Sequence, residues 1–175
     1  MKVEVGCSIK AMLCDQFGVN ADYIDNRIKT IFLNSHPVDD VDSTIIDDGS
    51  TLALAAAMPG LAGATFRRGG DLASFRSTIT HQEGTVPVKR QNGIIVIKLF
   101  NLVIRELGPT FLKAGILVSK NQLSDFFTQQ SQDFLKACKS VKINGDNSTV
   151  DALKHLDTCS DSGNLIVYVT SILQS

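Results

Sequence analysis

The sequence contains no tryptophan, and aromatic residues make up only 6% of its 175 positions. It also lacks an excess of either charge, because 17 basic and 18 acidic residues leave a formal net charge of -1. Proteins that neutralise nucleic-acid phosphates usually carry a clear basic excess, and single strands are commonly held by aromatic side chains on which bases stack. We therefore expect no nucleic-acid partner.

Long apolar runs and closely spaced cysteines are absent as well. The longest apolar runs, residues 52–58 and 94–97, are far shorter than the about 20 residues that span a bilayer. The first residues place charge inside a short apolar stretch, which is not the pattern of a secretion signal. The four cysteines are Cys7, Cys14, Cys138 and Cys159. Because no pair has the C-x-x-C spacing typical of zinc sites, we expect a cytoplasmic protein with reduced thiols, no membrane association, no metal ion and no cofactor.

The first seventy residues show an orderly mixture of strands and one helix. Residues 2–5 alternate charge and valine, as a half-buried strand does. Ser8 can cap a helix that ends before Gly18, and residues 29–33 and 51–54 have strand character. The acidic stretch between residues 39 and 48 lacks the spacing of a calcium loop, which favours a solvated acidic face.

The segment from Thr44 to Leu54, with its Asp47-Asp48-Gly49 turn, resembles the D-G-containing strand entry of the ubiquitin-like sulfur-carrier proteins. The Pro/Gly/Ala-rich stretch 58–64 and the later Gly69-Gly70 pair resemble the tail of the same family. The resemblance implies a β-grasp fold over residues 1–70. It also implies a Gly-Gly tail whose carboxylate an adenylating partner enzyme activates. Members of the family open with a hairpin before the helix, whereas one strand fits before Ser8.

The run Arg67-Arg68-Gly69-Gly70 is therefore the candidate functional segment, and three hypotheses for it stay open. As a carrier tail it would need cleavage of the bond between Gly70 and Asp71, because more than a hundred residues follow. As an anion-binding loop it would use its backbone N–H groups and its two arginines. As a plain connection it would only join two structural units.

The second half predicts an α+β unit over residues 75–175, joined to a β-grasp-like unit over residues 1–70. Short strands are expected at 76–81, 86–90 and 94–99, the last two joined by an Asn92-Gly93 hairpin turn, to give a three-stranded meander. Helices are expected from residue 101 to 107, from Ser119 through a phenylalanine-rich stripe to Cys138, and from Ser148 or Thr149 to residue 156. Further short strands are expected at residues 142–144 and 165–170.

No catalytic constellation is visible in the sequence. His81-Gln82-Glu83 and the pair of Asp151 and His155 are the polar groups that come nearest to a base with its orienting carboxylate, and no nucleophile motif accompanies them. We therefore expect a non-enzymatic α+β protein with a protein partner, and homo-oligomers stay open. The two functional hypotheses are a carrier that works with an adenylating enzyme and a binding or assembly module that uses the Arg/Gly loop for a protein or an anion.

Overall fold

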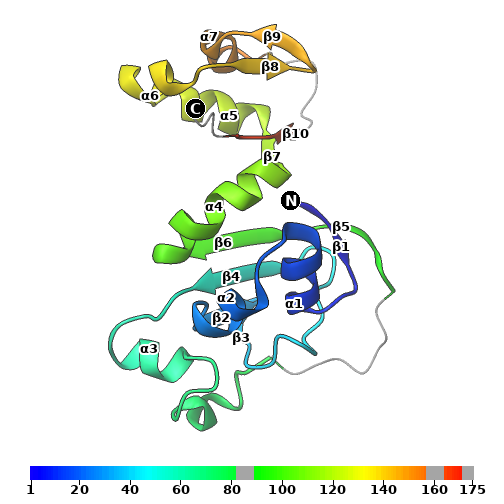
Figure 1. Cartoon of the computed structure of the whole chain (residues 1–175), viewed down its shortest axis with the longest axis vertical. Coiled ribbons are helices and arrows are strands. Elements are labelled where there is room, and N and C mark those ends of the chain that lie inside the picture. Colours follow the sequence, from blue (N-terminus) through cyan, green and yellow to red (C-terminus); the bar gives the residue numbers. More distant parts are fainter. Residues whose placement is uncertain (82–88, 157–163, 171–175) are drawn as a thin grey trace. The chain divides into compact units, whose positions relative to one another are not determined.

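The computed structural model describes residues 1–81, 89–156 and 164–170 (Figure 1). The protein is α+β, as the sequence predicts, and the chain forms two compact units. One unit comprises Met1–Gly115 with Tyr168–Ser175, and the other comprises Ile116–Val167. The division thus falls after Gly115 and not between residues 70 and 75, because strands that follow residue 90 pair with strands that precede residue 60.

The first unit contains most of the elements expected before residue 70 and several that follow it. In chain order they are β1 (Lys2–Val5), α1 (Ile9–Ala11), the π-helical turn η1 (Met12–Gln16), α2 (Ala21–Asn26), β2 (Thr30–Leu33), β3 (His36–Pro37), β4 (Thr51–Ala55), α3 (Gly60–Phe66), the 3-10 turn η2 (Ala73–Arg76), β5 (Gln91–Ile94), β6 (Val96–Phe100) and α4 (Leu102–Ala114).

The main sheet has the order β3-β2-β4-β6 (Figure 1). Strands β3 and β4 both run antiparallel to β2, whereas β6 runs parallel to β4. Strand β5 pairs antiparallel with β1. Only Ile95 separates β5 from β6, and its N–H donates to the carbonyl of Met1 at 3.0 Å, while the next N–H, that of Val96, donates to Ser50 at 2.9 Å. Residues 91–100 therefore act as one long strand that changes partner at Ile95.

One face of this sheet carries the hydrophobic core. The inward side chains of β2 and β4 alternate with outward ones and pack against α1, η1, α2 and α4, with Phe17 and Phe111 edge to face at 4.8 Å between ring centroids. Fully buried members of the core are Ile9, Met12, Leu13, Ile24, Ile31, Leu33, Leu52, Leu54 and Val103. The opposite face carries the outward side chains of β2, β4 and β6.

Local signals in the sequence are confirmed where they depend on near neighbours. The hydroxyl of Ser8 accepts a hydrogen bond from the Ala11 N–H at 3.2 Å and so caps α1. Gly18, with φ of +65°, ends the helical segment, and Gly49, with φ of +79°, makes the turn into β4. Asn34 and Ser35 both have positive φ and join β2 to β3 in a tight hairpin.

Three predicted features of residues 60–114 are wrong. Residues 76–81 form the end of η2 and following turns, not a strand. Asn92 and Gly93 lie inside β5 and make no hairpin turn, because they pair with β1. A Cβ at Gly93 would lie 2.9 Å from Asp48 Oδ1 and from both Val5 Cγ atoms, so the glycine allows close approach of these segments. The three-stranded meander is therefore not formed; of the predicted strand 86–90, residues 86–88 lie outside the described residues.

Three helices of the first unit also differ from expectation. Helix α2 is a short helix capped by Asn20 that was not predicted. Helix α4 was expected to end at residue 107, but it continues through Gly108 and Pro109 to Ala114. Pro109 has no N–H to donate to the Arg105 carbonyl, and water can replace this donor because Arg105 is an exposed residue. Helix α3 was not predicted, since its sequence is rich in glycine and alanine and has no capping side chain.

The second unit is smaller and has its own pairs of strands. It contains β7 (Ile116–Ser119), α5 (Lys120–Thr128), α6 (Gln132–Ala137), β8 (Val141–Ile143), β9 (Asp146–Ser148), α7 (Val150–Lys154) and β10 (Asn164–Val167). Strand β7 pairs antiparallel with β10, and β8 forms a hairpin with β9. Ser119 caps α5, as the sequence predicts, and Gln122 completes a capping box with it. The prediction of one helix from Ser119 to Cys138 is wrong, because α5 ends at Thr128 and Ser131 caps a second helix, α6.

Candidate functional site

The Arg/Gly loop, residues 67–70, follows α3 and is held in place by hydrogen bonds from its backbone N–H groups. The Arg68 N–H donates to the Lys29 carbonyl at 2.7 Å, and the Gly70 N–H donates to the Arg67 carbonyl at 3.1 Å. Between them, the Gly69 N–H donates to Asp39 Oδ1 at 3.1 Å, with Gly69 at φ of +60°. Three successive N–H groups of the loop thus already have hydrogen-bond partners.

A buried arginine on η2, Arg76, binds both the loop and its acceptor Asp39. Arg76 is 2% exposed, and its Nη1 and Nη2 donate to the two carboxylate oxygens of Asp39 at 3.0 and 2.6 Å. Its remaining donors reach the carbonyls of Thr65 and Arg67 and the hydroxyl of Thr80 at 2.7, 3.2 and 2.9 Å. A guanidinium can be buried at this depth because every side of it meets an acceptor.

This arrangement decides what the loop can bind. The carboxylate of Asp39 already occupies the place that an external anion would take, since it accepts from both Gly69 and Arg76. The side chain of Arg68 is engaged by the Ile24 carbonyl and by Asp25 at 3.1 and 3.2 Å. Of the four residues in the candidate segment, Arg67 alone presents an exposed charged side chain.

Sequence reasoning missed both Asp39 and Arg76, because nothing in the acidic stretch marks one aspartate as different from the others. The acidic stretch was expected to be a solvated face, but Asp39, Asp40 and Asp48 accept hydrogen bonds from backbone N–H groups. Asp40 accepts from the N–H groups of Asp42 and Ser43, and Asp48 Oδ1 accepts from the Ile94 N–H at 2.7 Å.

The histidines singled out from the sequence make ordinary structural contacts. Nδ1 of His36 lies 3.1 Å from the Ile79 carbonyl, and the His81 N–H donates to Pro37 at 2.7 Å. His155 ends α7, where Asp151 pairs with Lys154 at 2.9 Å. Gln82 and Glu83 lie outside the described residues.

The cysteines and the possible metal ligands give no site in the part of the chain that the structure describes. Cys7, Cys14 and Cys138 are free thiols, and burial raises the pKa of the Cys7 and Cys14 thiols. Cys159 lies outside the described ranges. Within residues 1–81, 89–156 and 164–170, no group of three His, Cys, Asp or Glu residues is placed to hold a metal ion. In the same ranges no helix combines the length and the apolarity needed to cross a bilayer.

On the face of the main sheet opposite the core, Phe66 of α3 lies 5.3 Å from Phe32 of β2 between ring centroids. The same face carries a shallow groove of about 350 Å³. Its floor is Ala53 on β4, which is aligned with Phe32 on β2 and with Lys98 on β6. Because the central strand carries small side chains and its neighbours carry large ones, the surface is hollowed along β4. The groove is lined by Phe32, Ser35, Thr51, Ala53, Ala55, Met58, Lys98 and Phe100. It contains one charged side chain, that of Lys98, among mostly apolar ones.

Strand β6 borders the groove on the side opposite β2, and among the described residues it is the outer strand of the sheet there. Backbone groups alternate in direction along a strand. The Val96 N–H points toward β4, so the N–H and carbonyl groups of Ile97 and Leu99 point away from it. Val96 and Phe100 are each 49% exposed. The strand thus combines an outward-facing polar backbone with exposed apolar side chains.

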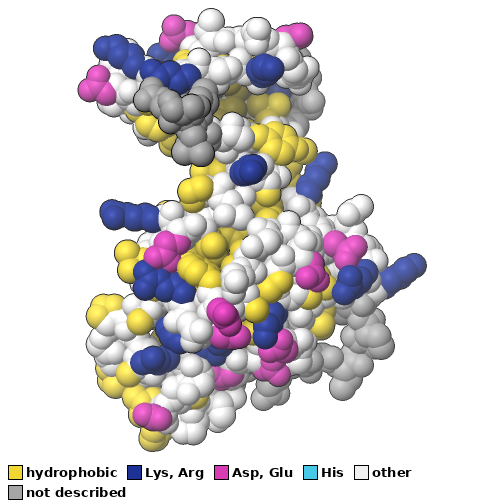
Figure 2. All heavy atoms as spheres, in the orientation of Figure 1, with side chains coloured by type: hydrophobic (Ala, Val, Ile, Leu, Met, Phe, Trp, Pro, Cys, Tyr) yellow, Lys and Arg dark blue, Asp and Glu magenta, His cyan; other side chains and the backbone are white. Residues whose placement is uncertain are grey.

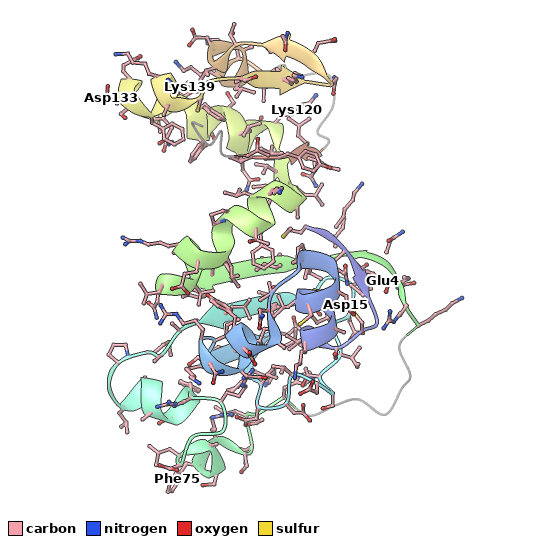
Figure 3. The ribbon with its side chains drawn as sticks, viewed as in Figure 1. Glu4, Asp15, Phe75, Lys120, Asp133 and Lys139 are labelled. Carbon is pink, nitrogen blue, oxygen red and sulfur yellow. The ribbon has the colours of Figure 1, made fainter. Side chains whose placement is uncertain are left out.

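Outside the groove, the surface of the first unit carries mixed charges and an isolated exposed phenylalanine. Figure 2 shows acidic and basic side chains interspersed over the visible face, in agreement with the near balance of charge. Phe75 on η2 is 82% exposed and projects from the ribbon (Figure 3), but it is not among the residues that line the groove.

An ion-pair network ties α2 to α4. Glu106 accepts from the Tyr23 hydroxyl at 2.6 Å and from Arg27 Nε at 3.0 Å. Hydrogen bonds from Arg27 and Tyr23 lower the pKa of Glu106 to about 2. Burial, followed by the hydrogen bond to Glu106, raises the pKa of Tyr23 to about 12.

These shifts predict a loss of stability at both extremes of pH. Glu106 stabilises the fold above its ordinary pKa of 4.5, and this contribution is lost as the pH falls toward about 2. Tyr23 stabilises the fold below its ordinary pKa of 10.0, and this contribution is lost as the pH rises toward about 12. In urea titrations over this pH range, Glu106→Gln should remove the loss of stability that Glu106 contributes in acid. It should reduce the loss that Tyr23 contributes in alkali, because the hydrogen bond to the carboxylate is gone, but should not abolish it, because Tyr23 remains buried. Asp71→Asn, which changes charge equally, should leave both unchanged; a Glu106→Gln profile that matches the parent would refute the assignment.

The first unit therefore presents a loop closed by Asp39 and Arg76 and an open groove beside an outer strand. Comparison of the whole chain with protein-family models, with curated proteins and with solved structures finds no match.

Proposed function

We propose that this protein is a non-enzymatic protein-binding module whose contact surface is the groove on the main sheet together with strand β6. The groove is the observation that carries the proposal: an alanine floor lies between Phe32 and Phe100, open on the face opposite the core. Its polar lining consists of Lys98 and the hydroxyls of Ser35 and Thr51, which offers no pairing of a base with an acid or nucleophile activated by it. An apolar lining with few polar groups suits recognition of another molecule.

We further infer that the first unit is a β-grasp with its strands in circularly permuted order. The sulfur-carrier family opens with a hairpin, whereas β1 is the single strand before α1. Strand β5 supplies the antiparallel partner of β1, and β6 continues it in parallel beside β4. Residues 91–100 would then take the place of the first strand of the family. This inference is supported by strand order and direction.

In this proposal the Arg/Gly loop is a structural connection. The carrier hypothesis requires two further events in these residues. The chain must be cleaved after Gly70, and the hydrogen bonds of Arg68, Gly69 and Gly70 must be released together with the contacts of Arg76. It stays a prediction, and an intact mass from the native host would support it by showing a fragment that ends at Gly70 or by a sulfur-for-oxygen exchange there.

Site-specific photocrosslinking tests the binding proposal. A photoreactive phenylalanine analogue in place of Phe100, in cells that make this protein, should give a discrete covalent adduct with a partner protein. The same analogue in place of Phe75 is the matched control, because Phe75 is more exposed but lies away from the groove.

A second substitution makes the test specific to the groove. Ala53→Arg fills the floor and should abolish the adduct formed from position 100, provided that the variant retains the circular dichroism and melting behaviour of the parent. Equal adducts from positions 75 and 100, or an adduct that survives Ala53→Arg, would contradict the proposal.

A further inference from the structure

We propose that the partner supplies an extended segment that pairs antiparallel with the outer edge of β6 and places a carboxylate opposite Lys98. This inference rests on the proposed binding function and identifies the chemistry of the segment that is bound. It is drawn from the backbone edge, from the strand that already pairs along that edge, and from the side chains that flank it.

The outer edge of β6 offers main-chain groups that form no hydrogen bond with another part of the described chain. Among the described residues the main sheet ends at β6, and the polar backbone groups of Ile97 and Leu99 point away from β4. An outer strand of this kind is a ready template for a further strand. Main-chain hydrogen bonds to Ile97 and Leu99 would give such a complex its affinity, and alternate side chains would give it specificity.

The direction of the added strand follows from the pairing already present. Strand β1 runs antiparallel to β5, and this pairing extends to Ile95, where Met1 and Ile95 exchange hydrogen bonds of 2.6 and 3.0 Å. Ile97 and Leu99 are the next two positions on the same side of the same long strand. An incoming antiparallel segment would therefore lie end to end with β1.

The side chains on the groove face of β6 specify the sequence of the segment. These are Val96, Lys98 and Phe100, with Val96 and Phe100 half exposed. Lys98 forms no ion pair with the described residues. Residues directly opposite one another on paired strands interact, and opposite charges there are favourable. The fitting pattern is apolar, acidic, apolar at alternate positions.

A second copy of this chain fits the same edge less well. In the antiparallel register that uses both Ile97 and Leu99, the two-fold axis places Lys98 directly opposite Lys98 of the other copy. Like charges in that position are destabilising, and a lysine in the middle of an outer strand is a recognised device against self-pairing. Charge complementarity therefore favours an acidic segment over a homodimer.

The test uses the full chain and two fluorescent peptides with the cores Val-Thr-Glu-Thr-Val and Val-Thr-Lys-Thr-Val, measured by anisotropy at low salt. The acidic peptide should bind at least about tenfold more tightly than the basic one, since one pair changes from attraction to repulsion. Lys98→Glu should reverse this preference. Lys113→Glu, which makes the same change in net charge at an exposed position on α4, should leave it unchanged.

Hydrogen exchange of the backbone amides locates the peptide. Binding should slow exchange at Ile97 and Leu99, and N-methylation of the peptide at alternate residues should abolish this protection. No binding, a preference that Lys98→Glu leaves unaltered, or protection elsewhere would overturn the inference. A concentration-dependent dimer in sedimentation that protects Ile97 and Leu99 would overturn it in favour of self-pairing. If position 100 still crosslinks to a partner, only the edge inference fails; if it does not, the binding function fails as well.

Discussion

Replacing Arg76 with methionine is expected to lower the free energy of unfolding by about 3 kcal/mol. Asp39 would lose both guanidinium donors and keep the Gly69 N–H, and the carbonyls of Thr65 and Arg67 would lose their Arg76 donors. Methionine keeps much of the volume of the side chain, so the change reports mainly on the lost hydrogen bonds and ion pair. Urea unfolding of the parent and the variant measures the difference. Amide exchange at Gly69 and Gly70 should become faster, because the loop loses its anchor.

Two further variants show whether the effect belongs to the pairing with Asp39. Arg67→Met removes an exposed arginine nine positions away on the same loop segment, and we expect a change within about 0.5 kcal/mol. Asp39→Asn combined with Arg76→Met should cost much less than the sum of the single changes, since both remove the same interaction. Additive effects, or a stable Arg76→Met variant with unchanged exchange at Gly69, would show that the loop is held in another way.

Gly6→Ala is expected to destabilise the protein by about 2 to 4 kcal/mol through two separate causes. Gly6 has φ of +80°, where a side chain is strained. An added Cβ would also lie 2.6 Å from the Lys89 carbonyl oxygen, so backbone would have to move. The crossing of Gly6 with Lys89 precedes β5, and its loosening should weaken the pairing of β1 with the long strand that lines the groove.

Gly18→Ala separates the two causes. Gly18 has φ of +65° but no heavy atom within 4 Å of the added Cβ, so only the backbone strain of about 1 to 2 kcal/mol applies. The difference between the two variants in thermal or urea unfolding therefore measures the close approach at Lys89. If Gly6→Ala is no worse than Gly18→Ala, β1 and β5 do not cross as closely as the structure has them.

The elements predicted correctly from the sequence depend on residues within a few positions of one another. Ser8 caps a helix through the Ala11 N–H, Ser119 caps α5 through the Gln122 N–H, and Gly49 turns the chain by its own φ. The prediction failed at Asn92-Gly93, where a good turn sequence became a strand because it pairs with β1 and because Asp48 accepts from the N–H of the next residue, Ile94. Local preference is weak compared with a full set of cross-strand hydrogen bonds.

The candidate site shows the same division. Arg67, Arg68, Gly69 and Gly70 were recognisable as a segment from composition, but their hydrogen-bond partners were not, because Asp39 lies 30 residues from Gly69 in the chain. The groove was invisible for a similar reason. Ala53, Phe32 and Lys98 are unremarkable residues in separate strands until the pairing register aligns them.

By itself the sequence determined the α+β class, the helices capped by Ser8 and Ser119, and the strands β1, β2 and β4, since these follow from alternation, caps and glycine geometry over short distances. Tertiary structure alone decided that residues 91–100 join the first unit, that Asp39 fills the Arg/Gly loop, and that a groove opens beside β6. Each of these depends on which distant backbone groups meet, and the energy of such a meeting belongs to the pair of segments and to neither one alone.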